Sequence, residues 1–266
     1  MVMRLFSRHA TKLVFLANLL MLSSCSVVPS ATSQKNTESV AAKALDLYKP
    51  FPLIGHSSQA PSESALSHWQ HRALPGKQIT HYRYEWMDER HTVLATATMS
   101  ASMLRQSVHV EPSRLGRVKF SWKVPALIAG ADLTLRETHD SPVRLVLAFE
   151  GDRSKFSMKN SMLSELALAL TGEALPYATL MYVWCNTCSK DEVLLNPRTD
   201  RIREIALESG PEQLGQWRGY ERDIRADFEK AFGEQPGALV DIGLMTDTDN
   251  TKQNTKAWYG AVSLSD

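Results

Sequence analysis

The fold of this chain is decided by residues 117–124, which read RVKFSWKV. Four apolar side chains at every second position, from Val118 to Val124, alternate with charged or hydroxyl-bearing ones. A period of two is typical of a strand with one buried and one exposed face. Pro125 follows directly, and it ends the strand because proline has no amide hydrogen for a sheet ladder. The stretch therefore predicts a half-buried β-strand.

Similar strand patterns occur on both sides of this stretch. Because several of the predicted strands are short and have one polar face, they favour antiparallel sheets packed face to face, a β-sandwich. The other strands are predicted at residues 82–86, 93–99, 143–149, 177–184, 201–207, 239–245 and 257–264.

Two helices interrupt the strands. The Leu/Ala run Glu165–Thr171 stops at Gly172, and Glu221–Phe232 has one apolar face and stops at Gly233. Both are expected to pack against a sheet. The predicted fold class is therefore dominated by β-structure, an antiparallel sandwich with two short packing helices.

The N-terminus has the layout of a secretory signal. Residues 1–12 hold three cations and no acid, and the apolar run Leu13–Leu22 is too short to span a bilayer. The sequence Leu22-Ser23-Ser24-Cys25 is similar to the bacterial lipobox, whose cysteine becomes the lipid-bearing first residue. We expect a lipoprotein signal peptide over residues 1–24 and lipidation at Cys25. The alternative is an ordinary secretory leader with a coincidental cysteine.

The segment after Cys25 is poor in residues that could be buried. We expect a flexible tether over residues 25–44 and a β-sandwich domain over residues 45–266. Ser26, rather than aspartate, follows the cysteine, which favours an outer-membrane lipoprotein that faces the periplasm over an inner-membrane one.

Charge excludes some partners. Without its three leader cations, the formal net charge of the chain changes from +1 to −2, and no basic tract is left. We therefore expect no nucleic-acid partner, and we expect membrane contact through the lipid anchor. Neither a phosphate-binding glycine loop nor a common catalytic motif occurs, so no cofactor is predicted.

Several strings in the second half resemble a single family. They are SPVR at 141–144, FEGD at 149–152, LTGEALPYATLMYVW at 170–184, RTDRIR at 198–203, AFGE at 231–234, MTDTDNT at 245–251 and AWYG at 257–260. From about Leu74 onward the chain resembles the bacterial domain-of-unknown-function family 3047 of envelope proteins. The resemblance implies a jelly-roll-like sandwich, similar in shape to carbohydrate-binding modules, with no catalytic residue to carry over.

The loop Thr246–Lys256 is the first candidate site. Asp247, Asp249 and Asn250 supply oxygen atoms at nearby positions, which suits a hard cation or a glycan. The loop does not match the EF-hand pattern, and Asx side chains also stabilise turns by themselves. A structural turn, a cation loop and a glycan loop all stay open.

Two aromatic residues follow that loop. Trp258 shares a strand face with Val262 and Leu264, so we expect it in the core. Tyr259 lies on the opposite face and is the better ligand candidate, because an exposed aromatic ring can stack on a sugar.

Cys185 and Cys188 are a candidate disulfide. They follow the strand that ends at Trp184, and an exported chain meets an oxidising compartment. A redox-active C-x-x-C normally opens a helix, and the chain has no second cysteine pair for zinc. A structural bridge that fixes a loop is therefore preferred.

Three functions are compatible with these features. The leading hypothesis is a non-catalytic, lipid-anchored module that binds a saccharide or an envelope partner. A polysaccharide-acting hydrolase would need two carboxylates in one cleft, drawn from groups such as Glu150, Asp152, Asp247 and Asp249. A structural scaffold lipoprotein would need a sizeable exposed apolar patch instead.

Overall fold

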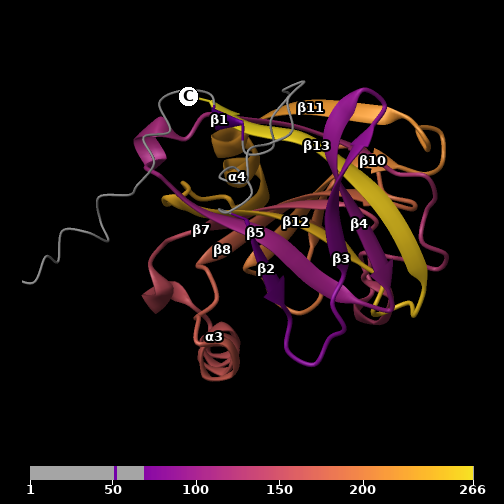
Figure 1. The fold of residues 1–266 in the computed structure, drawn as a ribbon. Coiled ribbons are helices and arrows are strands. Elements are labelled where there is room, and N and C mark those ends of the chain that lie inside the picture. The colour runs from indigo at the N-terminus through magenta and orange to yellow at the C-terminus, as the bar shows by residue number, and fades with distance from the viewer. Residues whose placement is uncertain (1–50, 53–68, 266) are drawn as a thin grey trace, which may run out of the picture. The chain divides into compact units, whose positions relative to one another are not determined.

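The computed structural model describes residues 51–52 and 69–265, which all belong to one unit, Lys43–Asp266. The signal peptide, the tether and the lipidation site at Cys25 lie outside the described residues. Two sheets and two helices make up the described part (Figure 1). This arrangement confirms the predicted antiparallel, jelly-roll-like β-sandwich with two helices.

The predicted strand at residues 117–124 is β6, Arg117–Lys123, inside the first sheet. This sheet has the order β11-β6-β13-β4-β3, with β1 paired to β13, and all its pairs are antiparallel. Its other strands are β1 (Phe51–Pro52), β3 (His81–Met87), β4 (Arg90–Thr98), β11 (Trp217–Asp223) and β13 (Asn254–Ser265).

The second sheet has the order β2-β5-β12-β7-β8-β10-β9. Its pairs are antiparallel except for β8 with β10, which run parallel. Its strands are β2 (Gln70–Ala73), β5 (Ala101–Val110), β7 (Arg144–Phe149), β8 (Ala178–Cys185), β9 (Val193–Leu195), β10 (Ile202–Ser209) and β12 (Leu239–Asp247).

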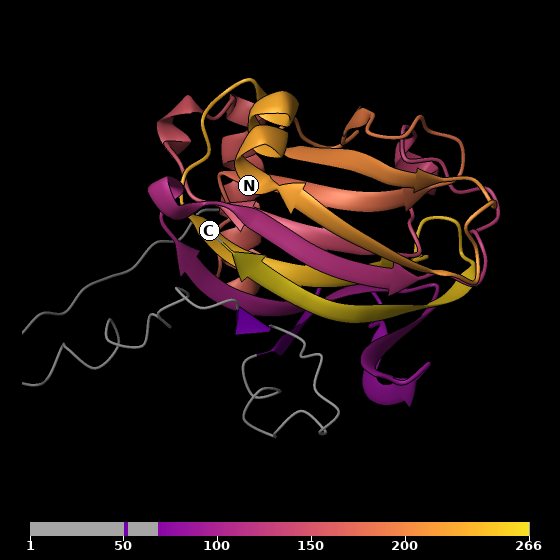
Figure 2. The same cartoon turned by 90° about the horizontal axis from the view of Figure 1, so that it is seen from above.

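The core lies between the two layers, which Figure 2 shows from above. Phe120 of β6 stacks on Tyr182 of β8 with ring centroids 5.5 Å apart, so aromatic residues join the two sheets directly. Trp122 and Trp184, one from each sheet, are completely buried. The alternation read from residues 117–124 thus places its apolar side chains in the core, as predicted.

Helix α4 (Ile224–Phe232) packs against the core. Phe228 is fully buried and contacts Phe149, with ring centroids 4.7 Å apart. The Asp223 side chain caps the helix by accepting from the Ala226 amide, and Gly233 ends it with a φ of 70°. The predicted start at Glu221 is wrong, because residues 217–223 pair along their whole length with β6.

Helix α3 (Met158–Thr171) is longer than predicted, because the Ser157 side chain caps it by accepting from the Asn160 amide. It ends at Gly172, as predicted, where a φ of 76° suits glycine. The helix buries Asn160 and Ser164, whereas most of its leucine and methionine side chains are exposed. No helix in the described part is long and apolar enough to cross a membrane.

Strand β5 escaped prediction because its buried side chains are partly polar. Ser102 and Gln106 are 0% and 3% exposed, and they share a face with Leu104. Polar residues at inward positions break the alternation of apolar and polar side chains that marks a half-buried strand. The sheet partner β12, not the local sequence, stabilises β5.

Candidate functional site

The loop after β12 leads into a cluster of buried charges on the outward side of the second sheet. We call the set Arg144, Glu204, Asp247, His139 and Asp140 the charged cluster. Each member is 5% exposed or less. They come from the starts or ends of different elements: β7, β10, β12 and the loop before β7. Sheet pairing therefore assembles the cluster from distant parts of the chain.

Arg144 is the central cation of the charged cluster. Its Nε donates to Asp247 Oδ1 at 2.8 Å, and its Nη1 lies 3.1 Å from Glu204 Oε2. Its Nη2 also donates to the carbonyl oxygen of His139 at 3.3 Å. Burying charges costs free energy unless they are paired, and here one guanidinium serves two carboxylates.

Asp140 fastens the loop after β12. Its Oδ2 accepts from Thr251 Oγ1 at 2.7 Å, and its Oδ1 accepts from the Asn250 amide at 3.2 Å. Asp249, which is 5% exposed, forms an ion pair with Lys77. The carboxylates of this loop are therefore bonded to protein donors.

Asp140, Asp247 and Asp249 offer oxygen atoms within 4.8 Å of one another, a spacing that a cation could use. However, Arg144 and Lys77 already neutralise two of these groups, and Thr251 donates to the third. A cation would have to compete with these donors. The cation-binding or ligand-binding role of Asp247, Asp249 and Asn250 stays a prediction.

Trp258 and Tyr259 face the opposite ways from those predicted. Tyr259 is 1% exposed in the core, and its hydroxyl contacts Thr246 Oγ1 at 2.8 Å. Trp258 is buried on the outward side of the first sheet, where its Nε1 donates to Glu85. The reason is a register shift between Tyr259 and Val262, because it reverses the inward–outward alternation within β13. Tyr259 as a ligand residue stays a prediction.

Polar and aromatic side chains gather around the β3–β4 hairpin. We call the set Trp86, Trp217, Asp88, Arg90 and Glu85 the hairpin surface. Strand alternation places Trp86, with its cross-strand partner His91, on one face of the hairpin, and Glu85 on the opposite face, where Arg90 and Asp88 contact Trp217. The Trp86 ring is the most exposed large aromatic group in the described part, at 55%, and it meets His91 edge-on with centroids 4.6 Å apart. A half-exposed indole beside a polar ring is a typical contact for a sugar.

The hairpin is held against the first sheet through Asp88. This carboxylate accepts from Trp217 Nε1 and from Lys123 Nζ, both at 2.8 Å. Hydrogen bonds from Lys123 and Trp217 hold the pKa of Asp88 below its usual range. The Arg90 guanidinium lies 4.7 Å from the Trp217 ring centroid, so this face of the hairpin offers donors and acceptors beside the Trp217 indole.

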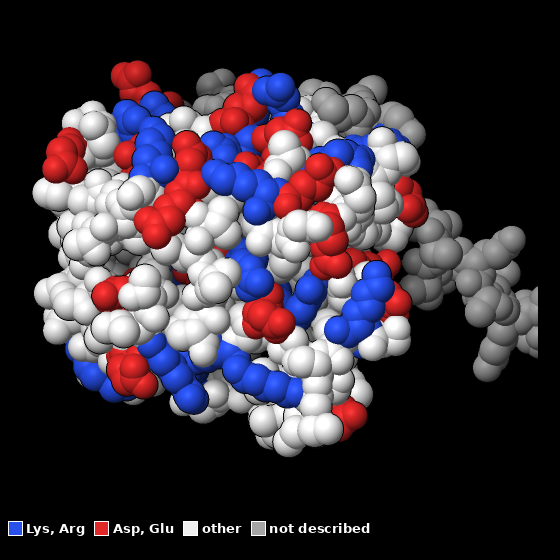
Figure 3. Space-filling model, turned by 180° about the vertical axis from the view of Figure 1, so that it is seen from behind, with Lys and Arg blue, Asp and Glu red and all other residues white. Residues whose placement is uncertain are grey.

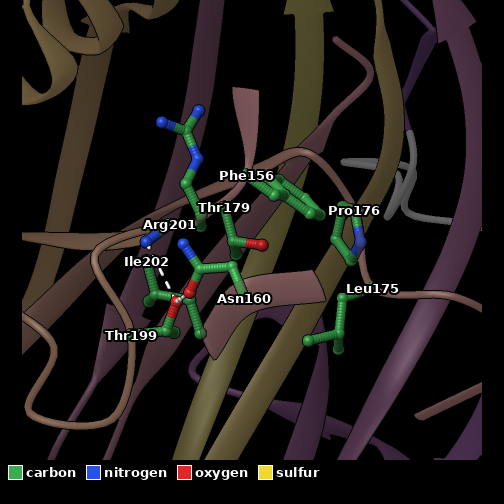
Figure 4. A pocket seen from close by; sticks show the side chains of 8 residues that line it. All are labelled: Phe156, Asn160, Leu175, Pro176, Thr179, Thr199, Arg201 and Ile202. Carbon is green, nitrogen blue, oxygen red and sulfur yellow. Dashed lines mark hydrogen bonds between the residues drawn. The ribbon is translucent and has the colours of Figure 1, made fainter. Parts of the chain in front are cut away.

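A small pocket lies beside α3. Its cavity volume is about 30 Å³, the size of about one water molecule. Figure 4 shows Phe156, Leu175 and Pro176 as apolar walls, with the Thr179 hydroxyl pointing between them. The pocket is too small to enclose a sugar ring.

The four carboxylates proposed for a hydrolase do not share one site, because Asp247 and Asp249 lie together at one end of β7 and Glu150 and Asp152 lie beyond the other end. Asp247 bonds to Arg144 at the start of β7, whereas the Glu150 amide donates to Ala238 just beyond the other end of that strand. A strand of six residues is about 20 Å long, so Glu150 lies far from Asp247. Asp152 accepts from Ser154 beside Glu150 and is exposed.

The structure joins Cys185 and Cys188 in a disulfide, with their Cα atoms 5.9 Å apart. Cys185 lies at the end of β8 and is buried with Leu133 and Leu194 in a small outward-facing core. The bridge therefore sits in packed structure, next to the turn formed by residues 186–189.

Three members of the charged cluster, Arg144, Glu204 and His139, were not found from the sequence. Arg144 stands alone among apolar residues in β7, and Glu204 lies between Ile202 and Ile205 in β10. A single charge in an otherwise apolar strand could have marked Arg144, because such a charge needs a buried partner. Strand β10 also carries Arg203 and Glu208, so this pattern does not mark Glu204.

The charged cluster predicts acid sensitivity. Burial opposes ionisation, but the charge of Arg144 and a hydrogen bond from His139 lower the pKa of Glu204 to about 2. An unfolded glutamate titrates near 4.3, so the stability that Glu204 contributes is present above about pH 4.3 and is lost as the pH falls to about 2.

Thermal unfolding across this range should show a steeper loss of stability for the wild type than for Glu204→Gln. Glu111→Gln, at an exposed carboxylate, should leave the slope unchanged. Equal slopes for the wild type and Glu204→Gln would contradict the assignment.

The chain is similar to known proteins in sequence and in fold. The model of a family described as "Protein of unknown function (DUF3047)" matches residues 67–263. No curated protein sequence matches the chain.

Among solved structures, the family 11 carbohydrate-binding module of the cellulase Lic26A-Cel5E of Clostridium thermocellum has a TM-score of 0.39 and 8% identity, over 82% of this chain and 96% of that chain. The xylan-binding module CBM86 of Roseburia intestinalis has a TM-score of 0.31 and 11% identity, over 81% and 92%. The xyloglucanase domain of NopAA from Sinorhizobium fredii has a TM-score of 0.36 and 9% identity, over 73% and 92%.

Proposed function

The chain belongs to the DUF3047 family, and we propose that it is a non-catalytic saccharide-binding module of the bacterial envelope, anchored by a lipid on Cys25. The observation that carries the proposal is the exposed Trp86 ring, which His91 meets edge-on near the end of the hairpin. Sugars present apolar C–H faces and polar hydroxyls together, so they bind where an indole lies beside hydrogen-bonding groups.

Polar groups on the opposite face of the hairpin from Trp86, beside Trp217 and Trp258, offer further contacts for a saccharide. Asp88 and Glu85 each accept from an indole N–H, and both carboxylates are still partly exposed, with side-chain exposures of 43% and 24%. Their remaining oxygen lone pairs are available to sugar hydroxyls. Arg90 and Arg83 add donors on the same hairpin.

The anchoring part of the proposal has a separate basis. Its support is the lipobox-like sequence before Cys25, together with the low-hydrophobicity segment that follows. Ser26 favours the outer membrane and a periplasm-facing domain. Both sets of residues lie outside the described part.

A second candidate function is that of a structural scaffold lipoprotein. The exposed leucine and methionine side chains of α3 favour it, because an exposed apolar patch is typical of an interaction surface. For a hydrolase, the separation of Glu150 from Asp247 along β7 counts against the pairing that the reaction needs.

Affinity electrophoresis tests the saccharide proposal. The wild type should be retarded in a gel that contains at least one soluble polysaccharide from a set of neutral, acidic and amino-sugar polymers. Trp86→Ala should weaken that interaction about tenfold or more, as expected for a central aromatic anchor. Leu135→Ala, which removes a 52% exposed side chain elsewhere, is the matched control and should bind normally. Equal retardation of wild type and Trp86→Ala would rule out the hairpin surface as the binding site.

A further inference from the structure

Helix α3 turns its apolar side chains away from the protein. We call the set Met158, Met162, Leu166 and Leu170, which recur every four residues, the α3 apolar face. Their exposures are 82%, 64%, 54% and 61%. The residues that the helix buries are polar, so it has the reverse of the pattern of a helix that packs on a core.

Polar bonds at both ends fix this orientation. Near the start of the helix, Asn160 Nδ2 donates to Asp200 at 2.6 Å, and Thr199 donates to Asn160 Oδ1 at 2.8 Å. Just beyond its end, Glu173 forms ion pairs with Arg72 at 2.6 Å and Arg105 at 2.9 Å. The outward direction of the α3 apolar face is therefore built into the fold.

The helix is also placed where a flat surface could reach it. In Figure 1, α3 projects below both sheets, and in Figure 3 the lowest part of the molecule is mostly uncharged. Three exposed cations, Arg153, Lys155 and Lys159, lie at or just before its N-terminal end. Apolar side chains bordered by cations suit a bilayer interface, where acyl chains and phosphates lie side by side.

We propose that α3 docks on a lipid bilayer and inserts its apolar face among the acyl chains of the nearer leaflet. This goes beyond the saccharide proposal, and it rests on the proposed anchor at Cys25 in one respect, the reach of the tether. Residues 26–50 could span about 80–90 Å when fully extended, so an anchored domain could lay α3 on the same membrane.

A bilayer suits this face better than a second copy of the chain. Four side chains that are half to four-fifths exposed form a patch of a few hundred Å², so two such patches fall short of the roughly 1,000 Å² that a specific interface needs. A bilayer requires no matching partner surface. Attachment of the protein to the membrane is also strengthened by a second contact, because a single acyl chain holds a protein only reversibly.

Vesicle flotation tests the proposal. The protein is the chain from Ser26 onward, which contains the whole unit Lys43–Asp266 and cannot be lipidated at Cys25. Vesicles of phosphatidylethanolamine and phosphatidylglycerol are the probe. The wild type should float with the vesicles, and Met162→Glu/Leu166→Glu should bind about tenfold or more weakly. Leu135→Glu/Leu195→Glu adds the same charges at two exposed leucines elsewhere and should bind like the wild type.

The outcomes separate the alternatives. All variants change exposed residues, so equal thermal midpoints will show that the fold is kept. Equal flotation of the wild type and the α3 variant, or no flotation of either, would overturn the proposal. A wild-type dimer in sedimentation that the α3 variant abolishes would also overturn it, because the face would then belong to a second copy. Neither the lipid anchor nor the hairpin surface takes part, so failure here leaves the saccharide proposal to its own test.

Discussion

Arg144→Met is expected to lower the free energy of unfolding by about 3–5 kcal/mol, since it removes the cation from a buried ionic group. Asp247 and Glu204 would then be buried without the guanidinium that pairs with both, 2.8 and 3.1 Å away. Glu204 is fully buried, so its carboxylate cannot rotate into the solvent. A methionine fills much of the arginine volume, so the loss would report charge rather than a cavity.

Urea unfolding at neutral pH measures this effect. Arg83→Met is the matched control, because Arg83 is 72% exposed in an ion pair with Glu85 and should cost less than about 1 kcal/mol. The double variant Arg144→Met/Glu204→Leu should regain part of the loss, since it removes one of the two carboxylates that lose Arg144 as their partner. A change for Arg144→Met no larger than that for Arg83→Met would mean that the charged cluster does not stabilise the fold.

Trp122→Ala should be about equally damaging, at about 3–5 kcal/mol. Trp122 is fully buried on β6 and lies 5.1 Å from the ring centroids of both Phe120 and Tyr220. Truncation would leave a cavity that the aromatic neighbours cannot fill.

Trp86→Ala provides the control for the same chemical change. With its ring 55% exposed, Trp86 should lose about 1 kcal/mol or less on truncation. Urea unfolding of the two variants side by side gives the comparison. Similar losses for both would show that β6 does not form the centre of the core.

Much of the fold could be predicted because local pattern and tertiary environment agree. In β6, each apolar residue of the alternation faces the core. The prediction failed where the surroundings override the pattern. In β5, buried Ser102 accepts from the Thr80 amide at 2.9 Å, so a polar residue is stable where an apolar one is expected. In β13, a register shift after Tyr259 reverses the two faces.

The candidate sites were harder to predict, because they depend on which residues the sheets bring together. Asp247 was singled out, but its partner Arg144 lies far away in sequence and was read only as part of a strand. Trp86 was placed in a strand, and its exposure depends on the position of the hairpin beyond the core. The outward α3 apolar face follows from polar contacts of Asn160 that local sequence does not reveal.

A glycan array probed with the wild-type chain from Ser26 onward tests the central claim most directly. The saccharide-binding proposal predicts binding to at least one class of polysaccharide, with that binding lost or strongly weakened in Trp86→Ala. Binding to no glycan on an array that covers bacterial and plant polysaccharides would contradict it.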